Sequence, residues 1–576
     1  MAARPDDRHR LIAFALFALG FALVFRGWLF TGFDRAFGDE EDGYLALAVI
    51  EHWRHVFAGE VRWTDPIIFF PERGTLGYTD AFFLLGVADA GLRRLGLDAF
   101  SAFMVVMAGL AAAGFFGFRR LAIHRFGVPS ACASMGAFLF AFANIDAVKL
   151  IHVQAYCAML LPILCDLVLS AWNAARRGAV LAAVAGVLYA LLFLTAYQTA
   201  WFFACYLVLM ALLYPAVFGR QATAALLREL VAKRAVVLGA AAGFAVGIVP
   251  FVILYVPVFL SGRSRDFAEV ASNMPLWRDV FDVTGANGVW GALFERLGIA
   301  ERPDRPVWEV ELAFTPGVLA VFAVALVMAA ARLTPLPPLE MGRVGVGMAG
   351  RILGAPGRSA GPLPDPPPQG GGGSIPDRTF LLMGLAVVGF WLLQMNYFGV
   401  RPWRAIWGIV PGAKAIRYTY RSQLVANLFV CLIVARALAG LARHRTAALV
   451  LCGFLIVEQI NLVWPATMSR RAALAWIDAV PAPPPNCRAF YVVPGAGPPE
   501  RSGPQHQDDA MLFAQIRGIP TVNGFSSWFP DGWALDEPAS PGYPAAVRVW
   551  ARRNHIEAQV CGLEPRTGRW VPGLPE

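Results

Sequence analysis

Charged side chains are scarce in this sequence. Asp, Glu, Lys and Arg make up 15% of the 576 residues, whereas 57% are hydrophobic. Soluble globular domains contain about 25% charged and roughly 45–50% apolar residues. This composition excludes a disordered chain and argues against a single soluble domain, because a water-soluble fold of this size could not bury so many apolar side chains. It favours a protein that lies in a lipid bilayer.

Several motifs of soluble chemistry are also missing. The sequence has no P-loop, no GxGxxG after a strand, no GxSxG elbow and no HExxH, so it gives no support to a nucleotide-sugar donor. It has no CxxC pair and no Cys/His cluster at zinc spacing, which argues against a structural zinc site. Six of the eight cysteines lie in apolar runs. Cys487 and Cys561 fall in a polar tail and are candidates for a disulfide if that tail lies in an oxidising compartment.

Long apolar runs predict membrane-spanning helices, since about 20 apolar residues cross the hydrocarbon core. We expect about eleven spans, at residues 11–30, 99–118, 129–146, 153–172, 178–196, 198–216, 235–260, 312–331, 379–396, 423–439 and 446–464. The first follows a basic N-terminus but is too long for a signal peptide and lacks a cleavage site. It is therefore interpreted as a retained helix.

Lys and Arg in the short loops predict the orientation of these spans. With the N-terminus in the cytoplasm, most loop cations lie inside, and an odd number of spans places the C-terminus outside. The apolar segment 81–92 is predicted to be a helix on the outer interface, because a further span would put Arg119 and Arg120 outside. The net charge of +9 then resides chiefly in cytoplasmic loops, which argues against nucleic acid as a partner.

The predicted fold class is mainly α: a polytopic transmembrane helical bundle in residues 1–465, followed by a small α+β outer domain in 466–576. The tail contains β-like runs at 488–493 and 556–560 and a possible helix at 508–517. A bridge between Cys487 and Cys561 would then join paired strands. The low-complexity stretch 333–378 is predicted to be a flexible cytoplasmic linker.

An acidic outer loop, residues 32–97, follows the first span and carries a net charge of −5 (eleven acids, six bases). It begins with four consecutive acids, Asp39, Glu40, Glu41 and Asp42. One interpretation is that these carboxylates cap the helix that starts at Gly43, where the helix dipole favours negative charge. The other is that Asp39 or Asp42 has a functional role, because further polar residues face the same side.

Those further residues lie in short turns at the outer ends of spans, where they can converge on one cavity. They are Asp146, Lys149, His152 and Gln154; Tyr197 and Gln198; Glu309 and Glu311; and Lys414, Arg417, Tyr418, Tyr420 and Arg421. His152 has a simpler interpretation as an interfacial hydrogen-bonding group. For Arg417 and Arg421, snorkelling to the interface and binding of a phosphate are equally compatible with the sequence.

Taken in order, these segments resemble the GT-C superfamily of glycosyltransferases, and more closely its bacterial polytopic members with a C-terminal extracytoplasmic domain. The resemblance rests on GDEEDGYLALAVIEHW, WTDPIIFFPERGTLGYTDAFFLLG, IDAVKLIHVQ, AIRYTYRSQLV and DDAMLFAQIRGIPTVNGFSSWFPDGW. It implies a bacterial inner-membrane enzyme with a cytoplasmic N-terminus and a periplasmic C-terminus. The implied reaction is sugar transfer from a polyprenyl-phosphate donor to a glycan or lipid acceptor in the cell envelope.

This chemistry suits the residues present. An acceptor hydroxyl needs a carboxylate base, for which Asp39 or Asp42 is expected, and a departing phosphate needs cations, for which Lys414, Arg417 and Arg421 are expected. Asp146 would orient the acceptor or, with Asp39 and Asp42, hold a divalent metal cation. Further candidates for substrate binding are Glu40, His152, Gln154, Tyr197 and Gln198. Direct displacement would invert the anomeric carbon, and a covalent route would need a second carboxylate.

Two other classes of function remain open from the sequence. A transporter or flippase of lipid-linked glycans would show internal repeats and polar groups at the membrane midplane, neither of which is evident here. A non-catalytic membrane assembly protein would use its outer domain to bind a partner. The aromatic stretch Phe525–Trp533 is compatible with such a contact, or equally with the core of that domain.

Overall fold

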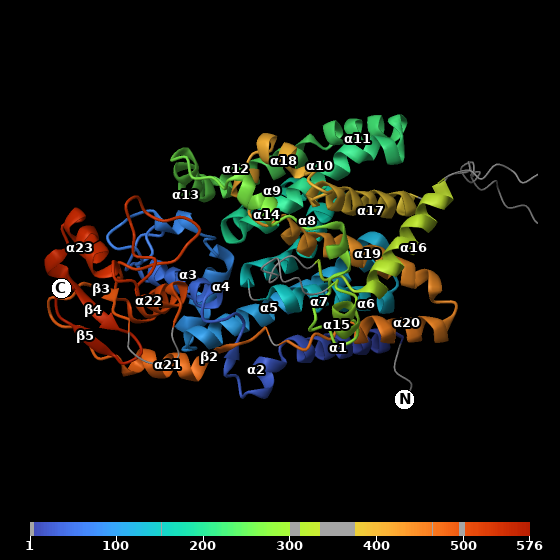
Figure 1. Cartoon of the computed structure of the whole chain (residues 1–576). Helices are drawn as coiled ribbons and strands as arrows, with labels where there is room; N and C mark the ends of the chain where they lie inside the picture. Colours follow the sequence, from blue (N-terminus) through green and yellow to red (C-terminus); the bar gives the residue numbers. More distant parts are fainter. Residues whose placement is uncertain are drawn as a thin grey trace, which may run out of the picture.

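The fold was analysed in a computed structural model of the chain, which describes residues 5–150, 152–174, 176–299, 312–333, 375–463, 465–494 and 501–575. Long helices run side by side in a bundle, and the C-terminal residues form a separate lobe at one end of it (Figure 1). Most of the predicted linker 333–378, and both Glu309 and Glu311, lie outside the described residues. The helices on either side of that linker end at Leu333 and begin at Ile375.

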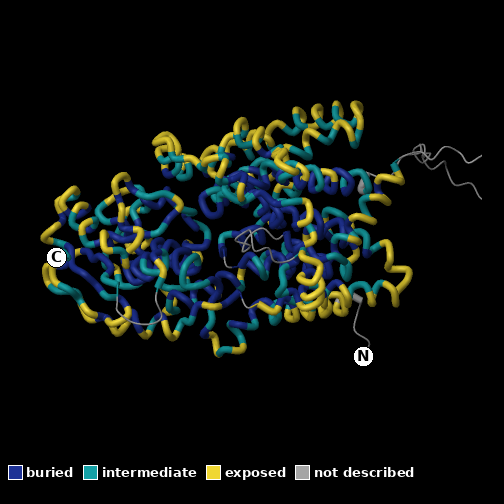
Figure 2. Tube along the Cα trace, viewed as in Figure 1, coloured by how far each residue is buried: buried dark blue, intermediate teal, exposed yellow. Residues whose placement is uncertain are grey.

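Eight helical segments among the described residues are long and apolar enough to cross a membrane, and they confirm eight of the predicted spans. They are formed by α5 (Ala99–Phe126), α6 (Ser130–Ala141) with α7 (Asn144–Lys149), η2 (Val153–Leu160) with α8 (Leu161–Asn173), α9 (Gly178–Thr195), α10 (Tyr197–Phe218), α16 (Pro316–Leu333), α17 (Ile375–Gln394), and η5 (Thr419–Ser422) with α19 (Gln423–Leu441). Exposed residues lie on the outer faces of the bundle (Figure 2). Many exposed residues of its helices are large and apolar, as expected for a surface in contact with lipid. The chain is a multi-pass membrane protein.

The other three predicted spans differ from the structure. Helix α1 (Pro5–Val24) begins with a charged turn, and the helix is interrupted at Phe25 before α2 (Arg26–Phe30). There the guanidinium group of Arg26 donates to the carbonyl oxygens of Asn461 and Val463. The predicted span 235–260 is divided into α12 (Arg234–Gly247) and α13 (Val249–Leu260), and α12 is bent by 72° from α11 (Arg220–Ala232).

The last of these spans, predicted at 446–464, is shortened to the 13 residues of α20 (Arg445–Val457). The helix ends at Glu458, whose carboxylate accepts hydrogen bonds from the backbone N–H groups of Gly317 and Val318 at the start of α16. A carboxylate at this position satisfies donors that α16 itself cannot. The side chain therefore joins two helices of the bundle.

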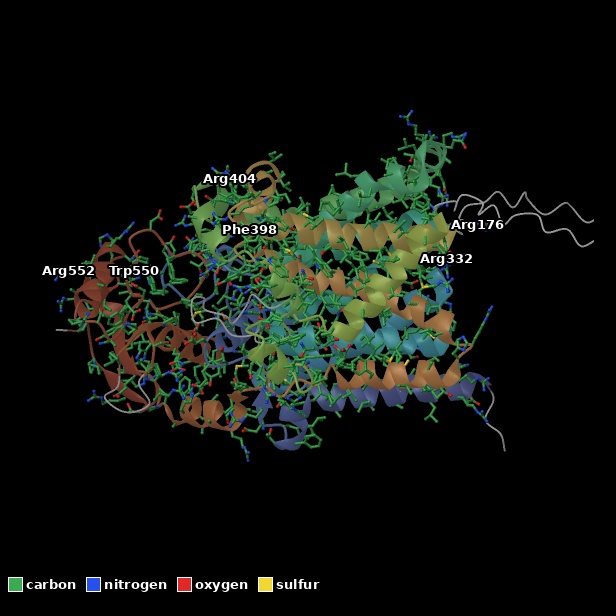
Figure 3. All side chains as sticks on the ribbon, turned by 45° about the vertical axis from the view of Figure 1, so that its right-hand side comes forward. Arg176, Arg332, Phe398, Arg404, Trp550 and Arg552 are labelled. Carbon is green, nitrogen blue, oxygen red and sulfur yellow. A yellow bond between two sulfur atoms is a disulfide. The ribbon has the colours of Figure 1, made fainter. Side chains whose placement is uncertain are left out.

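Connecting segments alternate between the two ends of the bundle. Arg176 and Arg332 lie at one end, and Phe398 and Arg404 lie toward the other, where the C-terminal lobe is found (Figure 3). The shorter elements that lie between the longer helices, before the C-terminal lobe, are β1 (Arg35–Ala36), α3 (Asp42–Ala58), η1 (Thr75–Tyr78), α4 (Phe83–Arg94), α14 (Phe267–Ser272), η3 (Trp277–Phe281), α15 (Gly291–Arg296), α18 (Trp403–Ile409) and η4 (Ala413–Ala415). The predicted helix at 81–92 is present as α4 and is not among the candidate spans.

The C-terminal lobe is a small α+β structure that is interwoven with the first loop. Its sheet has the order β3 (Ala489–Val492), β4 (Val560–Glu564), β5 (Arg569–Val571), with β3 and β4 parallel and β4 and β5 antiparallel. Around it lie α21 (Arg470–Ala479), α22 (Gly503–Arg517), α23 (Tyr543–Arg553) and η6 (Glu557–Gln559). β2 (Met468–Ser469) pairs with β1, and Phe70 donates its backbone N–H to Thr521.

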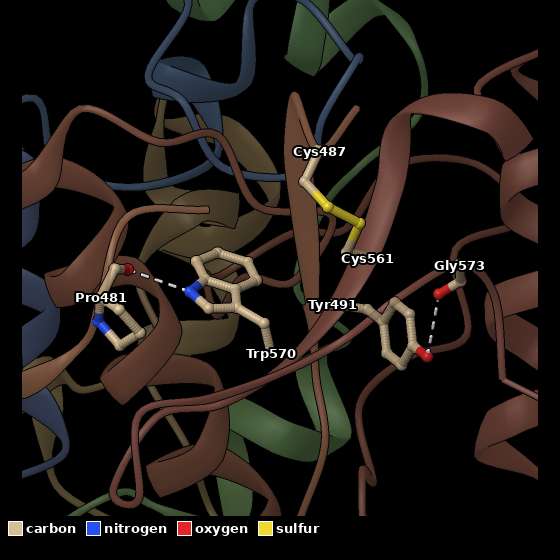
Figure 4. Close-up of a disulfide and its surroundings, with 6 residues drawn as sticks. All are labelled: Pro481, Cys487, Tyr491, Cys561, Trp570 and Gly573. Carbon is tan, nitrogen blue, oxygen red and sulfur yellow. Dashed lines mark hydrogen bonds between the residues drawn. A yellow bond between two sulfur atoms is a disulfide. The ribbon is translucent and has the colours of Figure 1, made fainter. Parts of the chain in front are cut away.

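A disulfide joins Cys487 to Cys561, as the sequence predicts (Figure 4). The two Cα atoms are 5.6 Å apart, and the bond links Cys487, two residues before β3, to the second residue of β4. Nearby, the indole N–H of Trp570 donates to the carbonyl oxygen of Pro481, and the hydroxyl of Tyr491 donates to the carbonyl oxygen of Gly573. The bridge therefore fixes the centre of the C-terminal sheet.

Candidate functional site

The acidic run after the first helices forms the start of α3. Oδ1 of Asp39 accepts the backbone N–H groups of Glu41 (3.0 Å) and Gly43 (3.3 Å). Such bonds satisfy donors that the first turn of a helix leaves unpaired. Asp39 therefore has the capping role that was one of the two interpretations of this sequence.

Asp42, the first residue of α3, is placed differently. Its side chain is 45% exposed, and its Oδ2 lies 3.1 Å from Nδ1 of the nearly buried His152. His152 precedes η2 in the turn after α7, so two of the predicted site residues meet although 110 positions separate them. We refer to Asp39, Asp42 and His152 as the acidic side of the site.

Asp146 does not join this group in the described part of the chain. It is buried, and its Oδ2 accepts the backbone N–H of Ala143, just before α7 begins. The carboxylate is thus directed toward the start of its own helix. Asp146 remains a prediction as a residue that orients the acceptor.

Glu40 is held by the C-terminal lobe. Its carboxylate lies 2.7 Å from Nη1 of Arg501 and 3.1 Å from Nη2 of Arg566, and both guanidinium groups also bind Asp509 on α22. Burial alone would raise the pKa of Glu40, but Arg501 and Arg566 outweigh it and lower the pKa below its usual value. Burial raises the pKa of Asp509 to about 6, against the opposing effect of the same two arginines. These four residues form an ionic lattice that fixes the start of α3 to the lobe.

Asp508, next to Asp509, has no such counterion. It is completely buried, and neither carboxylate oxygen has a hydrogen-bond partner in the part of the chain that the structure describes. Burial raises its pKa well above the usual value, and the nearby carboxylates, Asp42 foremost, raise it further. Burial and the neighbouring carboxylates therefore both favour the protonated form of Asp508.

The basic residues after α18 are positioned by a tight turn. Tyr197 donates its hydroxyl to the carbonyl of Gly412 (2.9 Å), and Trp201 donates its indole N–H to that of Pro411 (2.8 Å). Gly412 has a φ of +85°, and a Cβ there would lie 2.0 Å from the Tyr197 hydroxyl, so the turn requires glycine. Tyr197, predicted to bind substrate, thus also supports the segment that carries Lys414.

Aromatic rings hold the three predicted cations. The ammonium group of Lys414 lies 5.0 Å from the ring centroid of Trp407, and the guanidinium groups of Arg417 and Arg421 lie 4.8 and 4.9 Å from that of Tyr418. Cations over aromatic faces are attracted by the ring quadrupole while their edges stay available for other partners. The side chain of Arg417 is 43% exposed.

A fourth cation, Arg265, lies beside this group. Its Nη1 is 3.1 Å from Oε1 of Glu269, and the same oxygen lies 3.0 Å from Nε of Arg417. The backbone N–H of Arg265 donates to the carbonyl of Lys414 (2.9 Å). We refer to Arg265, Lys414, Arg417 and Arg421 as the basic side of the site.

Aromatic residues connect the two sides. Lys149, on the helix before His152, places its ammonium group 5.0 Å from the ring centroid of Tyr420. The ring of Tyr420 is 5.6 Å from that of Tyr418, which carries Arg417 and Arg421. The acidic turn and the basic segment are therefore parts of one continuous arrangement.

The remaining predicted residues are less constrained. Gln154 is half-buried on η2, and Oε1 of Gln198 is buried without a hydrogen-bond partner among the described residues. Asp80, which the sequence did not single out, accepts the backbone N–H of Tyr197 (3.1 Å). Burial raises the pKa of Asp80, although this hydrogen bond and the charge of Arg421 oppose the shift.

The predicted metal ligands do not fit a shared divalent site. Asp42 and His152 provide two donors, but Asp39 is used by backbone N–H groups and Asp146 is turned toward its own helix. Across the described ranges, no group of three or more His, Cys, Asp and Glu side chains is arranged to hold a metal ion.

No protein-family model matches the chain, and no curated protein matches it. Solved structures similar to it include those of the oligosaccharyltransferase of Archaeoglobus fulgidus. The apo form has a TM-score of 0.47 at 12% identity, with 96% of this chain and 69% of that chain covered. The complex with Zn and sulfate has a TM-score of 0.48 at 13% identity, with 96% and 67% covered. The complex with an inhibitory peptide and a dolichol-phosphate has a TM-score of 0.46 at 13% identity, with 96% and 69% covered.

Sequence reasoning did not identify Arg265, Glu269 or Asp508 as site residues. Arg265 and Glu269 lie in a segment between two predicted spans with no local motif, and they meet Arg417 across about 150 positions. Asp508 belongs to a pair of adjacent acids within the C-terminal segment DDAMLFAQ. The sequence shows the two adjacent acids. Only the packing of α22 against α3 distinguishes Asp508 from Asp509, which is paired with two arginines.

Proposed function

We propose that this protein is an integral-membrane glycosyltransferase that transfers a sugar from a polyprenyl-phosphate donor to an acceptor on the extracytoplasmic face. The observation that carries the proposal is a series of contacts that links a half-exposed carboxylate, Asp42, to a cluster of cations. It runs through His152, Lys149 and two tyrosines. Displacement of a phosphate needs these two functions, a base on one side and positive charge on the other. The resemblance of the sequence motifs to GT-C enzymes agrees with it.

In the proposed reaction, Asp42 takes the proton of the acceptor hydroxyl while that oxygen attacks the anomeric carbon. The bond from this carbon to the phosphate oxygen breaks, and the lipid phosphate leaves with the electron pair. Lys414, Arg417 and Arg421 stabilise the negative charge of the leaving group. His152 holds the carboxylate of Asp42, and direct displacement inverts the anomeric carbon.

Asp42 is preferred over Asp39 as the base because of their contacts. Oδ1 of Asp39 accepts two backbone N–H groups, so this carboxylate is already engaged at the start of α3. The side chain of Asp42 is half-exposed, and its Oδ2 contacts the imidazole of His152. The cellular setting proposed is the bacterial inner membrane, with the N-terminus in the cytoplasm and the C-terminal lobe in the periplasm.

The test is sugar transfer from a polyprenyl-phosphate sugar by the purified full chain. Asp42→Asn should lose a factor of about 10²–10⁴ in turnover, the range for removal of a general base. Asp39→Asn is the matched control, because Asn caps a helix as well as Asp does, and it should retain most of the turnover. Asp146→Asn tests the predicted orienting role and should chiefly raise the KM for the acceptor.

Three outcomes would contradict this assignment. Full turnover by Asp42→Asn would exclude Asp42 as the base, and loss of turnover by Asp39→Asn alone would transfer the role to Asp39. A wild-type protein that releases no sugar from any lipid-linked donor would favour the transporter or assembly-protein alternatives.

A further inference from the structure

The basic side contains a carboxylate that is shared by two arginines. Oε1 of Glu269 lies 3.1 Å from Nη1 of Arg265 and 3.0 Å from Nε of Arg417, so a single oxygen faces two guanidinium groups. A guanidinium edge offers two parallel N–H groups and matches a carboxylate best when both of its oxygens are used. The shared oxygen of Glu269 leaves part of this donor capacity unused.

The contact with Arg417 is close but poorly aligned. Nε of Arg417 is a buried atom that donates no hydrogen bond within the described part of the chain, although Glu269 is 3.0 Å away. A buried N–H without an acceptor costs free energy, because it has lost its hydrogen bonds to water. An additional acceptor oxygen at this position would remove that cost.

The surroundings hold the two guanidinium groups in place without neutralising them. Arg265 lies over the ring of Trp528 in the C-terminal lobe (4.8 Å to the centroid), and Arg417 lies over the ring of Tyr418 (4.8 Å). The backbone of Arg265 is tied to Lys414, whose ammonium group stacks on Trp407. Arg265, Arg417 and Lys414 together with Glu269 leave a net charge of +2. The negative charge of a phosphate ester or diphosphate would neutralise it.

We propose that Glu269 occupies the place of the donor phosphate in the free protein, and that the phosphate displaces it to bind between Arg265 and Arg417. This inference rests on the proposed function in taking the ligand to be a lipid-linked phosphate. It adds Arg265 to the phosphate site and gives Glu269 a role that opposes binding. The side chain of Glu269 is 31% exposed, which leaves it room to move aside.

The experiment measures binding to the purified full chain by calorimetry, with farnesyl phosphate and inorganic pyrophosphate as separate probes. Glu269→Gln should tighten binding about 2–5-fold, because the pair it breaks is partly exposed and worth roughly 0.2–1 kcal/mol. Arg265→Gln and Arg417→Gln should each weaken binding about 10-fold or more, as expected for loss of a charge-assisted hydrogen bond. Arg263→Gln is the matched control, since Arg263 lies in the same loop but pairs with Asp531, 2.6 Å away, and should leave binding unchanged.

The sign of the Glu269→Gln effect decides the proposal, because a misfolded variant would lose affinity and not gain it. Weaker binding by Glu269→Gln, no binding of either probe by the wild type, or equal behaviour of Arg265→Gln and Arg263→Gln would overturn it. Binding of farnesyl phosphate alone assigns the site to a lipid headgroup, whereas the same pattern with pyrophosphate assigns it to phosphate in general. Binding is measured without turnover. The phosphate site can therefore be confirmed even if the transferase proposal fails, and the transferase proposal can be confirmed even if the phosphate site is absent.

Discussion

The acidic and basic sides of the proposed site are held by different kinds of contact. The acidic side is fixed by ion pairs and backbone hydrogen bonds to the C-terminal lobe, through Glu40, Arg501, Arg566 and Asp509. The basic side is held mainly by stacking of cations on aromatic rings, with Glu269 as a shared carboxylate. Ion pairs satisfy the charges they hold, whereas a stacked cation keeps its charge and its donors for another partner.

This difference suggests a division of tasks. A carboxylate base works best when its position is fixed before the substrate arrives, and the lattice around Glu40 provides that rigidity at the start of α3. A phosphate site must attract and then release an anion, for which cations stacked on aromatic rings are suited. The following changes test the contrast, beginning with the largest expected effect.

Arg501→Gln should destabilise the lattice most. The side chain of Arg501 is only 10% exposed and binds both Glu40 and Asp509, so its loss leaves two carboxylates without one partner. Breaking a buried ion pair costs about 3–5 kcal/mol. The free energy of unfolding in detergent should fall accordingly, whereas Arg471→Gln, which removes a 75% exposed arginine paired with Asp34, should change it by about 1 kcal/mol or less. Equal effects of the two variants would contradict the lattice as the main support of this side.

Loss of the disulfide should also weaken the acidic side. Cys487→Ser opens a bridge that closes a long loop, and such bridges contribute about 2–4 kcal/mol. A reductant should lower the unfolding temperature of the wild type and leave that of the double variant Cys487→Ser/Cys561→Ser unchanged. Labelling of Cys487 and Cys561 by a thiol reagent before reduction would show that the bridge is not formed in the cell.

Asp508→Asn should raise stability in a pH-dependent manner. Burial raises the pKa of Asp508, so the folded state binds its proton more tightly, and stability is lost as the pH rises above the ordinary value near 4. Asn carries no such cost. The variant should therefore exceed the wild type by about 1–3 kcal/mol at pH 8 and match it near pH 4. Asp509→Asn should lower stability at pH 8, since Asp509 is the partner of two arginines.

The apolar runs of the sequence predicted most of the bundle, and the exceptions are instructive. Hydrophobicity identifies a segment that can cross a membrane, but it does not reveal where a polar side chain ends a helix. Glu458 ends α20 because it accepts N–H groups from α16, about 140 residues away, and Arg26 marks a break after α1 by binding carbonyl groups near residue 462. Both partners are distant in sequence.

The same reason separates the site residues that were predicted from those that were not. Asp42 and His152 lie in short segments next to spans, so topology alone brings them to one surface. The sequence could not choose between Asp39 and Asp42, because the choice depends on which carboxylate the backbone of α3 uses. Arg265 and Glu269 lie in a longer connection, and only tertiary contacts bring them to Arg417.

The smallest expected effect concerns the ring that carries two arginines. Tyr418→Leu removes the aromatic face under Arg417 and Arg421, each contact being worth about 0.5–1 kcal/mol at a partly exposed site. Because the ring positions the cations but does not neutralise them, the variant should weaken binding of farnesyl phosphate about 2–5-fold. Its unfolding temperature should change little. Tyr418→Phe keeps the aromatic face and should bind as the wild type does. If Tyr418→Phe were as weak as Tyr418→Leu, the hydroxyl and not the ring would be the group that matters, and stacking would not be what holds the basic side.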